Sequence, residues 1–101
     1  MLSFEKKPLS ETGLRQFITK ALDKGWIREG WHSEVENAYR NISEEDIRYG
    51  LSRKEWVLET AEPAKKGFKY LISTVDIEQE ELHLLVLPDT ETGTLKVLTK
   101  F

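Results

Sequence analysis

The sequence predicts an α+β fold in which three N-terminal helices pack on a four-stranded antiparallel β-sheet. Capped segments with a helical apolar period fill the first half of the chain, and apolar or alternating segments typical of strands fill the second half. This order favours an antiparallel meander with the helices on one face. A chain of 101 residues is long enough for one modest core, so we expect one domain over residues 1–101, with residues 1–9 as an N-terminal arm.

The first helix is predicted between Ser10, a residue type that caps helix N-termini, and Gly25, which suits the left-handed conformation at many helix C-termini. A short connector over residues 26–30 follows, for which an extended conformation is one alternative, and a second helix is predicted from residue 31 or 32 to residue 39. In the first helix, apolar residues recur at steps of three and one, which places them on one helical stripe. This stripe comprises Leu14, Phe17, Ile18, Ala21 and Leu22.

The third helix has the strongest local signal in the chain. Ser43 and Asp46 have the spacing of a capping box, in which each side chain accepts a hydrogen bond from the other residue's backbone N–H. Ile42 and Ile47 are spaced as a hydrophobic staple across the same helix start. We therefore expect a short helix that begins after Ser43 and ends at about residue 52.

Strand-like segments occupy the rest of the chain. Residues 62–67 are predicted to form a loop and residues 88–93 a turn, in which Gly93 can take a positive φ. The outer segments expose unpaired backbone groups in this interpretation, so a homodimer formed by strand pairing is a candidate assembly. The four predicted strands are residues 56–60, at an edge, 68–75, 82–87 and 94–101.

The composition excludes several kinds of chemistry. The chain has no cysteine, so disulfides, thiolate catalysis and cysteine-ligated zinc are ruled out, and we expect no metal site and no cofactor. Its net charge of −3, from 15 basic and 18 acidic residues, weighs against a dedicated nucleic-acid binder, although local patches matter more than the sum. The N-terminal segment lacks the apolar stretch of a signal peptide, and no apolar run is long enough to span a membrane, so we expect a soluble cytoplasmic protein with no membrane partner.

Two histidines and one arginine are the candidate catalytic residues. His32 stands at the start of the predicted second helix, and Arg40 lies eight residues later, two turns along the same helix face. His83 lies inside the apolar strand at residues 82–87. A helix carrying His32 and Arg40 and a sheet carrying His83 would supply the groups of a small acid/base site.

The candidate RNA contacts lie in the least acidic part of the second half of the chain. The basic residues Lys65, Lys66 and Lys69 could follow a phosphate backbone, although lysines in a predicted loop also serve solubility alone. Tyr70 has three candidate roles, which are stacking on a base, orienting a phosphate and packing in the core.

Short sequence motifs spread over residues 14–101 match one family pattern. They are Lys24-Gly25, His32-Ser33, Arg40-Asn41-Ile42-Ser43-Glu44-Glu45-Asp46-Ile47, Tyr70, Leu82-His83-Leu84-Leu85-Val86 and Val97-Leu98-Thr99-Lys100-Phe101. By these motifs the chain resembles the family called domain of unknown function 4258. It departs from the family pattern at Ser33, where alanine is usual, at Asn41, where glycine is usual, and at Glu36, where an arginine is expected.

The family is distantly similar to the compact toxin ribonucleases of the RelE, barnase and colicin-nuclease group. The resemblance therefore implies a metal-independent endoribonuclease, or toxin, whose site contains His32, Arg40 and His83. In such an enzyme a base deprotonates the ribose 2′-OH, an acid protonates the leaving 5′-oxygen, and a cation stabilises the charge on phosphorus. The histidines would be base and acid, Arg40 would bind the phosphate, and RNA would be the partner.

A non-catalytic interpretation stays open beside the first. His32 could be a capping residue, His83 a half-buried structural histidine, and Arg40 the partner of Glu36 one helical turn away. The protein would then be an interaction module or a degenerate relative without activity, which binds a cognate, antitoxin-like protein through an acidic and aromatic surface. The sequence predicts that the nuclease would gather the three candidate side chains in one open, positively charged groove.

Overall fold

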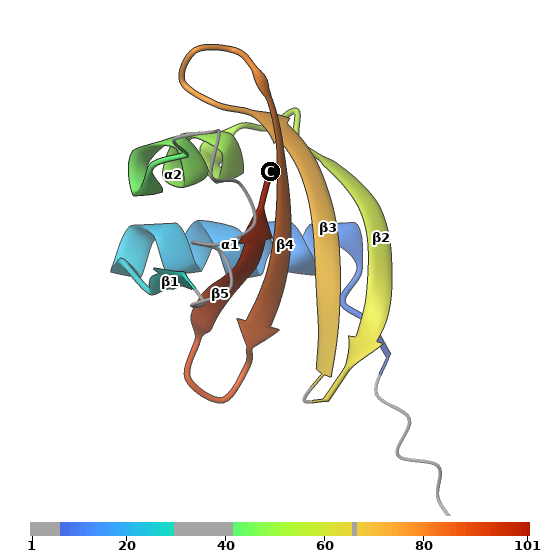
Figure 1. The fold of residues 1–101 in the computed structure, drawn as a ribbon. Coiled ribbons are helices and arrows are strands. Elements are labelled where there is room, and N and C mark those ends of the chain that lie inside the picture. The colour runs from blue at the N-terminus through green and yellow to red at the C-terminus, as the bar shows by residue number, and fades with distance from the viewer. Residues whose placement is uncertain (1–6, 30–41, 66) are drawn as a thin grey trace, which may run out of the picture.

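The structure is a computed structural model that describes residues 7–29, 42–65 and 67–101. Two helices and five strands lie in this part of the chain (Figure 1). In chain order they are α1 (Glu11–Lys24), β1 (Ile27–Glu29), α2 (Glu44–Ser52), β2 (Val57–Ala64), β3 (Gly67–Val75), β4 (Glu81–Asp89) and β5 (Thr94–Lys100).

The α+β class is confirmed, but the predicted four-stranded antiparallel sheet is wrong in detail. The sheet has five strands in the order β1-β5-β4-β3-β2, and β1 pairs with β5 in parallel. The extra strand was predicted as a connector because three residues are too few to show a strand period. The helix predicted from residue 31 or 32 to residue 39 lies outside the described residues.

Strand boundaries also differ from the sequence prediction. Residues 62–64 and 67 belong to strands and not to the predicted loop: β2 continues to Ala64, β3 begins at Gly67, and Pro63 lies opposite Phe68. Pro63 is tolerated there because β2 is an edge strand, whose outer side needs no backbone donor. The predicted edge at residues 94–101 is also wrong, because β5 lies between β1 and β4.

Both described helices begin and end as their sequences predict. The Ser10 side chain accepts a hydrogen bond from the N–H of Gly13 (3.0 Å), and Gly25 ends α1 in the left-handed conformation at φ 73°. At the start of α2, Ser43 and Asp46 form the complete capping box. Such a cap contributes about 1 kcal/mol because it pairs backbone donors that the helix itself leaves free.

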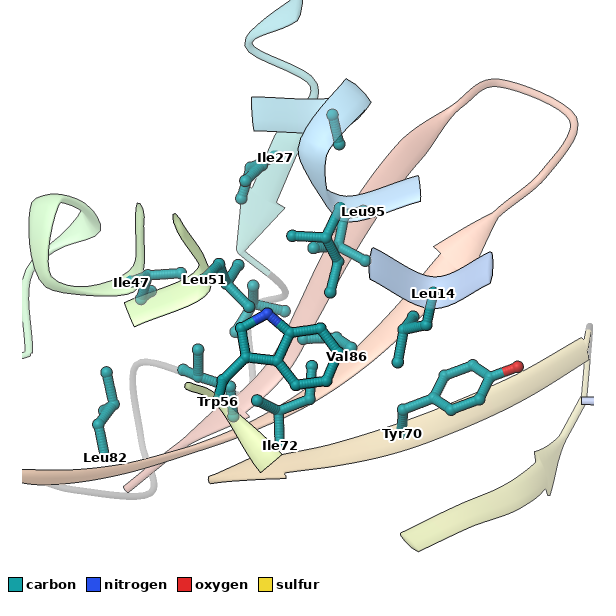
Figure 2. Close-up of a cluster of buried hydrophobic side chains, with 14 of the residues drawn as sticks. Leu14, Ile27, Ile47, Leu51, Trp56, Tyr70, Ile72, Leu82, Val86 and Leu95 are labelled. Carbon is teal, nitrogen blue, oxygen red and sulfur yellow. The ribbon is translucent and has the colours of Figure 1, made fainter. Parts of the chain in front are cut away.

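The core lies between the two helices and one face of the sheet. Figure 2 shows Trp56, which ends the α2–β2 connection, in the middle of this core, between Leu51 of α2 and Ile72 of β3. The Arg15 guanidinium lies 3.8 Å from the centre of the Trp56 ring, and its Nη2 donates to the Trp56 carbonyl at 2.7 Å. The buried apolar residues are Leu14, Ile18, Ala21, Ile27, Ile42, Ile47, Leu51, Trp56, Tyr70, Ile72, Leu82, Leu84, Val86, Leu95 and Val97.

The other face of the sheet carries no described helix, since α1 and α2 lie on the same side (Figure 1). Along β4, residues alternate between buried and half-buried positions, so every second side chain points away from the helices. We call this surface the open face. Its members on the paired strands include Val57, Thr60, Lys69, Leu71, Ser73, Val75, Glu81, His83, Leu85, Leu87, Lys96, Thr99 and Phe101.

Candidate functional site

His83 lies on the open face, near the start of β4. Its side chain is 27% exposed, so its imidazole is neither sealed in the core nor fully in water. The strand register places it in a row with one residue from each neighbouring strand: Ser73 of β3 is its Cα partner on one side. On the other side, His83 and Phe101 exchange both backbone hydrogen bonds, at 2.7 and 3.0 Å.

Three side chains surround the His83 ring. Ser73 Oγ lies 3.0 Å from Nδ1 at hydrogen-bond distance, and Glu81 Oε1 lies 3.2 Å from Nε2. The Phe101 ring is stacked on the imidazole, with 5.2 Å between the ring centres and 24° between the planes. Glu81 reaches Nε2 because residues two apart on a strand share a face, and its side chain is 79% exposed.

This arrangement fixes one imidazole nitrogen and leaves the other reachable. Ser73 is partly buried between strands, so its contact with Nδ1 sets the orientation of the ring. Glu81 is mainly in water, so a substrate group can take its place at Nε2 without disturbing packing. While Glu81 contacts Nε2, that nitrogen carries the hydrogen and the Ser73 hydroxyl donates to Nδ1, because a carboxylate can only accept. When a substrate group displaces Glu81, the ring can take the other tautomer, in which Nδ1 donates to Ser73 and Nε2 carries the lone pair that can accept a proton.

The charges of the open face are mixed. Lys69 forms an ion pair with Glu62 across β2 and β3 at 3.9 Å, and the carboxylate of Glu81 lies directly against His83. At the far end of β4, hydrogen bonds from the backbone N–H groups of Glu91 and Thr92 hold Asp89 Oδ1, at 3.1 and 3.4 Å. The described part of the open face is therefore not the strongly basic groove of a dedicated nucleic-acid binder.

The structure locates only some of the predicted site residues. His32, Arg40 and Lys66 lie outside the described residues, so the predicted meeting of His32 and Arg40 with His83 stays a prediction. Lys65 is exposed in the hairpin between β2 and β3, and Lys69 is half-buried on the open face.

Of the three roles considered for Tyr70, the structure shows packing. Its side chain is 2% exposed, lies on the helix-covered face and belongs to the core. Its hydroxyl accepts a hydrogen bond from the N–H of Leu9 at 2.7 Å, which holds the N-terminal segment against the sheet. A ring buried in this way is not accessible to a nucleic-acid base, so Tyr70 is removed from the candidate RNA contacts.

Sequence reasoning missed the three residues that surround His83. Glu81 had a signal, because a Glu-X-His spacing on a strand puts both side chains on one face. Ser73 and Phe101 had none, because their position beside His83 depends on the strand registers, which local sequence does not fix.

Within residues 7–29, 42–65 and 67–101, no group of three or more histidine, aspartate and glutamate side chains is arranged to hold a metal ion. In the same residues no helix combines the length and the apolar character needed to cross a membrane. No family model matches the chain, and no curated protein and no solved structure matches it either.

Proposed function

We propose that this protein is a metal-independent endoribonuclease whose reaction takes place on the open face at His83. The single observation that carries the proposal is an imidazole at an accessible position on the sheet, with Nδ1 held by Ser73 and Nε2 directed at a displaceable carboxylate. The resemblance to domain of unknown function 4258, and through it to the toxin ribonucleases, supplies the reaction type and adds His32 and Arg40 to the proposed site.

In this proposal His83 Nε2 exchanges the proton of the reaction. As base it takes the proton of the ribose 2′-OH while the 2′-oxygen attacks phosphorus, which forms a 2′,3′-cyclic phosphate and releases the 5′-oxygen. The second histidine protonates that leaving oxygen, and Arg40 stabilises the negative charge on the phosphoryl oxygens. Ser73 is a positioning residue, because it touches the imidazole and not the substrate.

Cleavage of single-stranded RNA in the presence of EDTA tests this proposal. We expect products ending in 2′,3′-cyclic phosphate, no cleavage where the 2′-OH is replaced by hydrogen, and at least a hundredfold loss of rate in His83→Gln, as is typical when a general acid or base is removed. The matched control is Thr60→Ala, which changes an exposed open-face residue of β2 and should keep the wild-type rate. Cleavage that persists in His83→Gln would contradict the proposal.

A second readout uses growing cells. Expression of an active ribonuclease should depress growth and translation, and His83→Gln should relieve this effect. Growth that is equally depressed by both proteins would indicate a cause other than His83.

The apolar content of the open face favours a second candidate, a protein-interaction module without catalysis. Leu71, Leu85 and Leu87 lie beside one another on β3 and β4 and are only half-buried. Surfaces of this kind are common where another protein binds. This candidate predicts that Leu85→Asp and Leu87→Asp abolish binding to a cognate protein, whereas His83→Gln does not, and that no RNA is cleaved.

A further inference from the structure

The two hairpins of the sheet separate at the end that is remote from His83. Pairing between β3 and β4 ends at Tyr70 and Val86. Beyond this pair, β3 continues in contact with β2 alone and β4 continues in contact with β5 alone. Figure 1 shows the ends of the β2–β3 and β4–β5 hairpins diverging at the bottom of the view. The space between them is a cleft of about 770 Å³.

Pro88 explains why the ladder stops. His83 directs its backbone N–H and C=O at Phe101 of β5, and because these groups alternate along a strand, the even-numbered residues of β4 direct theirs at β3. Pro88 would be the next residue to donate to β3 after Val86, and proline has no N–H. By the same alternation, the backbone N–H and C=O of Phe68 point into the cleft.

The cleft combines an apolar surface with charged groups at its rim. Leu87 of β4 lines it on the open face, and Phe68 of β3 lines it from the covered face, where its half-buried ring also packs against the core. Lys65 and Lys96 line it from the β2–β3 hairpin and from β5. Both lysines are exposed, and neither forms an ion pair with another residue in the part of the chain that the structure describes. Two acids also line the cleft, and one of them, Asp89, is bonded to its own turn and interacts electrostatically with Lys96.

We propose that this cleft binds one nucleotide unit of single-stranded RNA, with the base in the gap between the hairpins, against the exposed part of the Phe68 ring, and the phosphate at Lys65 and Lys96. The volume lies within the range of small-ligand sites, aromatic rings stack on any base, and lysines are the usual partners of phosphate. This inference rests on the proposed function, since it assigns part of the substrate of the same enzyme.

The open-face side of the cleft, at Leu87, and His83 lie on one path. Leu87 is four residues after His83 on β4, so the two lie about 14 Å apart at the rise of an antiparallel strand, and both side chains point to the open face. An RNA strand seated in the cleft can therefore continue over Leu85 to the imidazole. The cleft would set which nucleotide lies a short distance from the bond that is cut.

An extended peptide that adds to β3 is the competing occupant, and the structure favours it less. Only residues Gly67–Lys69 of β3 are open to the cleft, and Pro88 on the facing strand has no donor, so few backbone hydrogen bonds could form. The two lysines and the aromatic ring have no particular role in such pairing, whereas a nucleotide uses all three.

Binding is tested without cleavage by following the amide NMR signals of His83→Gln during titration with each of the four nucleoside 5′-monophosphates and with short single-stranded RNA. We expect shifts at Phe68, Leu87 and Lys96. Lys65→Glu combined with Lys96→Glu should weaken RNA binding about tenfold or more and reduce the slope of log affinity against log salt by about 1 for each phosphate that the variant no longer binds. Lys20→Glu combined with Lys54→Glu changes the net charge equally, at exposed sites that do not line the cleft, and should alter affinity much less.

The outcomes separate this inference from the proposed function. Shifts confined to the cleft, with the lysine dependence above, support it even if the wild-type protein cleaves no RNA, in which case only the proposed function fails. RNA cleavage that is lost in His83→Gln but unaffected by Lys65→Glu and Lys96→Glu, with no shifts in the cleft, overturns the inference and leaves the proposed function standing. Equal weakening by the control pair, or shifts in the cleft with extended peptides alone, also overturns it.

Discussion

The two faces of the sheet differ in what covers them and in what they carry. One row of the covered face pairs Ile72 with Leu84, both fully buried under the helices. The adjacent row of the open face, one residue further on β3 and one residue earlier on β4, pairs Ser73 with His83, whose side chains hydrogen-bond in partial contact with water. A step of one residue therefore separates the part of the sheet that holds the fold together from the part that carries the candidate site.

This difference has a physical cause. A buried apolar side chain contributes about 1.5–3 kcal/mol through its removal from water, and the covered face collects such residues from both helices and from strands β1, β3, β4 and β5. The open face is not needed for that purpose, so it can carry an imidazole, a hydroxyl and a carboxylate whose burial would cost free energy. Substitutions on the two faces should then have different consequences.

Two neighbouring leucines of β4 test the comparison with the largest expected effect. Leu84 is fully buried against the helices, whereas Leu85 is half-buried on the open face. Leu84→Ala should lower the free energy of unfolding by about 2–5 kcal/mol because it leaves a cavity in the core. Leu85→Ala should lower it by about 1 kcal/mol or less, since water already reaches this side chain. Urea unfolding measures both, and equal losses would show that the open face is covered in solution.

Two glycines test how closely the helices are packed on the covered side, by the stability cost of adding a methyl group. A methyl group at Gly50 of α2 would lie 2.7 Å from Thr74 Cγ2 and 3.1 Å from the carbonyl oxygen of Val75, so Gly50→Ala should force α2 away from β3 and cost about 1–3 kcal/mol. At Gly25 nothing lies within 4 Å of the added methyl, and only the positive φ of 73° opposes it. Gly25→Ala should therefore cost about 1 kcal/mol in the free energy of unfolding, measured in urea.

Local sequence determines the parts of the fold that were predicted well. The caps at Ser10, Gly25 and Ser43 depend on residues three or four positions away, and the structure forms each of them. By contrast β1 has only three residues and exists because Ile27 is placed opposite Leu95 in parallel pairing. Such a contact between distant segments leaves no periodic signal in a three-residue stretch.

The candidate site likewise combines features that local sequence predicts with contacts between distant segments that it does not predict. The position of His83 on a strand could be predicted from its apolar neighbours, and its contact with Glu81 follows from their spacing. Its contact with Ser73 depends on the β3–β4 connection, in which Asp76 accepts hydrogen bonds from the N–H of Glu80 and of Gln79 and Gln79 takes a φ of 68°. A turn one residue longer would shift the register and place another residue beside the imidazole.

The smallest expected effect on stability is that of Asp89, at the far end of β4 on the open face, because the charged groups there remain in water. Slight desolvation raises the pKa of Asp89, but hydrogen bonds from the backbone N–H groups of Glu91 and Thr92, a hydrogen bond from the Thr92 hydroxyl and the charge of Lys96 outweigh it, so this pKa lies below its ordinary value. A carboxyl whose pKa is depressed by folding stabilises the folded state while it is ionised in both states, that is, above about pH 4.

That contribution should disappear as the pH falls through the lower pKa of the folded state, because both states are then protonated. Asp89→Asn keeps a side-chain oxygen for the turn but removes the charge, so the stability difference between wild type and variant should be constant above about pH 5 and shrink in more acidic solution. Urea midpoints measured from pH 2 to pH 7 report this difference. A difference that grows on acidification would mean that folding raises the pKa of Asp89, so that the hydrogen bonds and the charge of Lys96 do not outweigh desolvation.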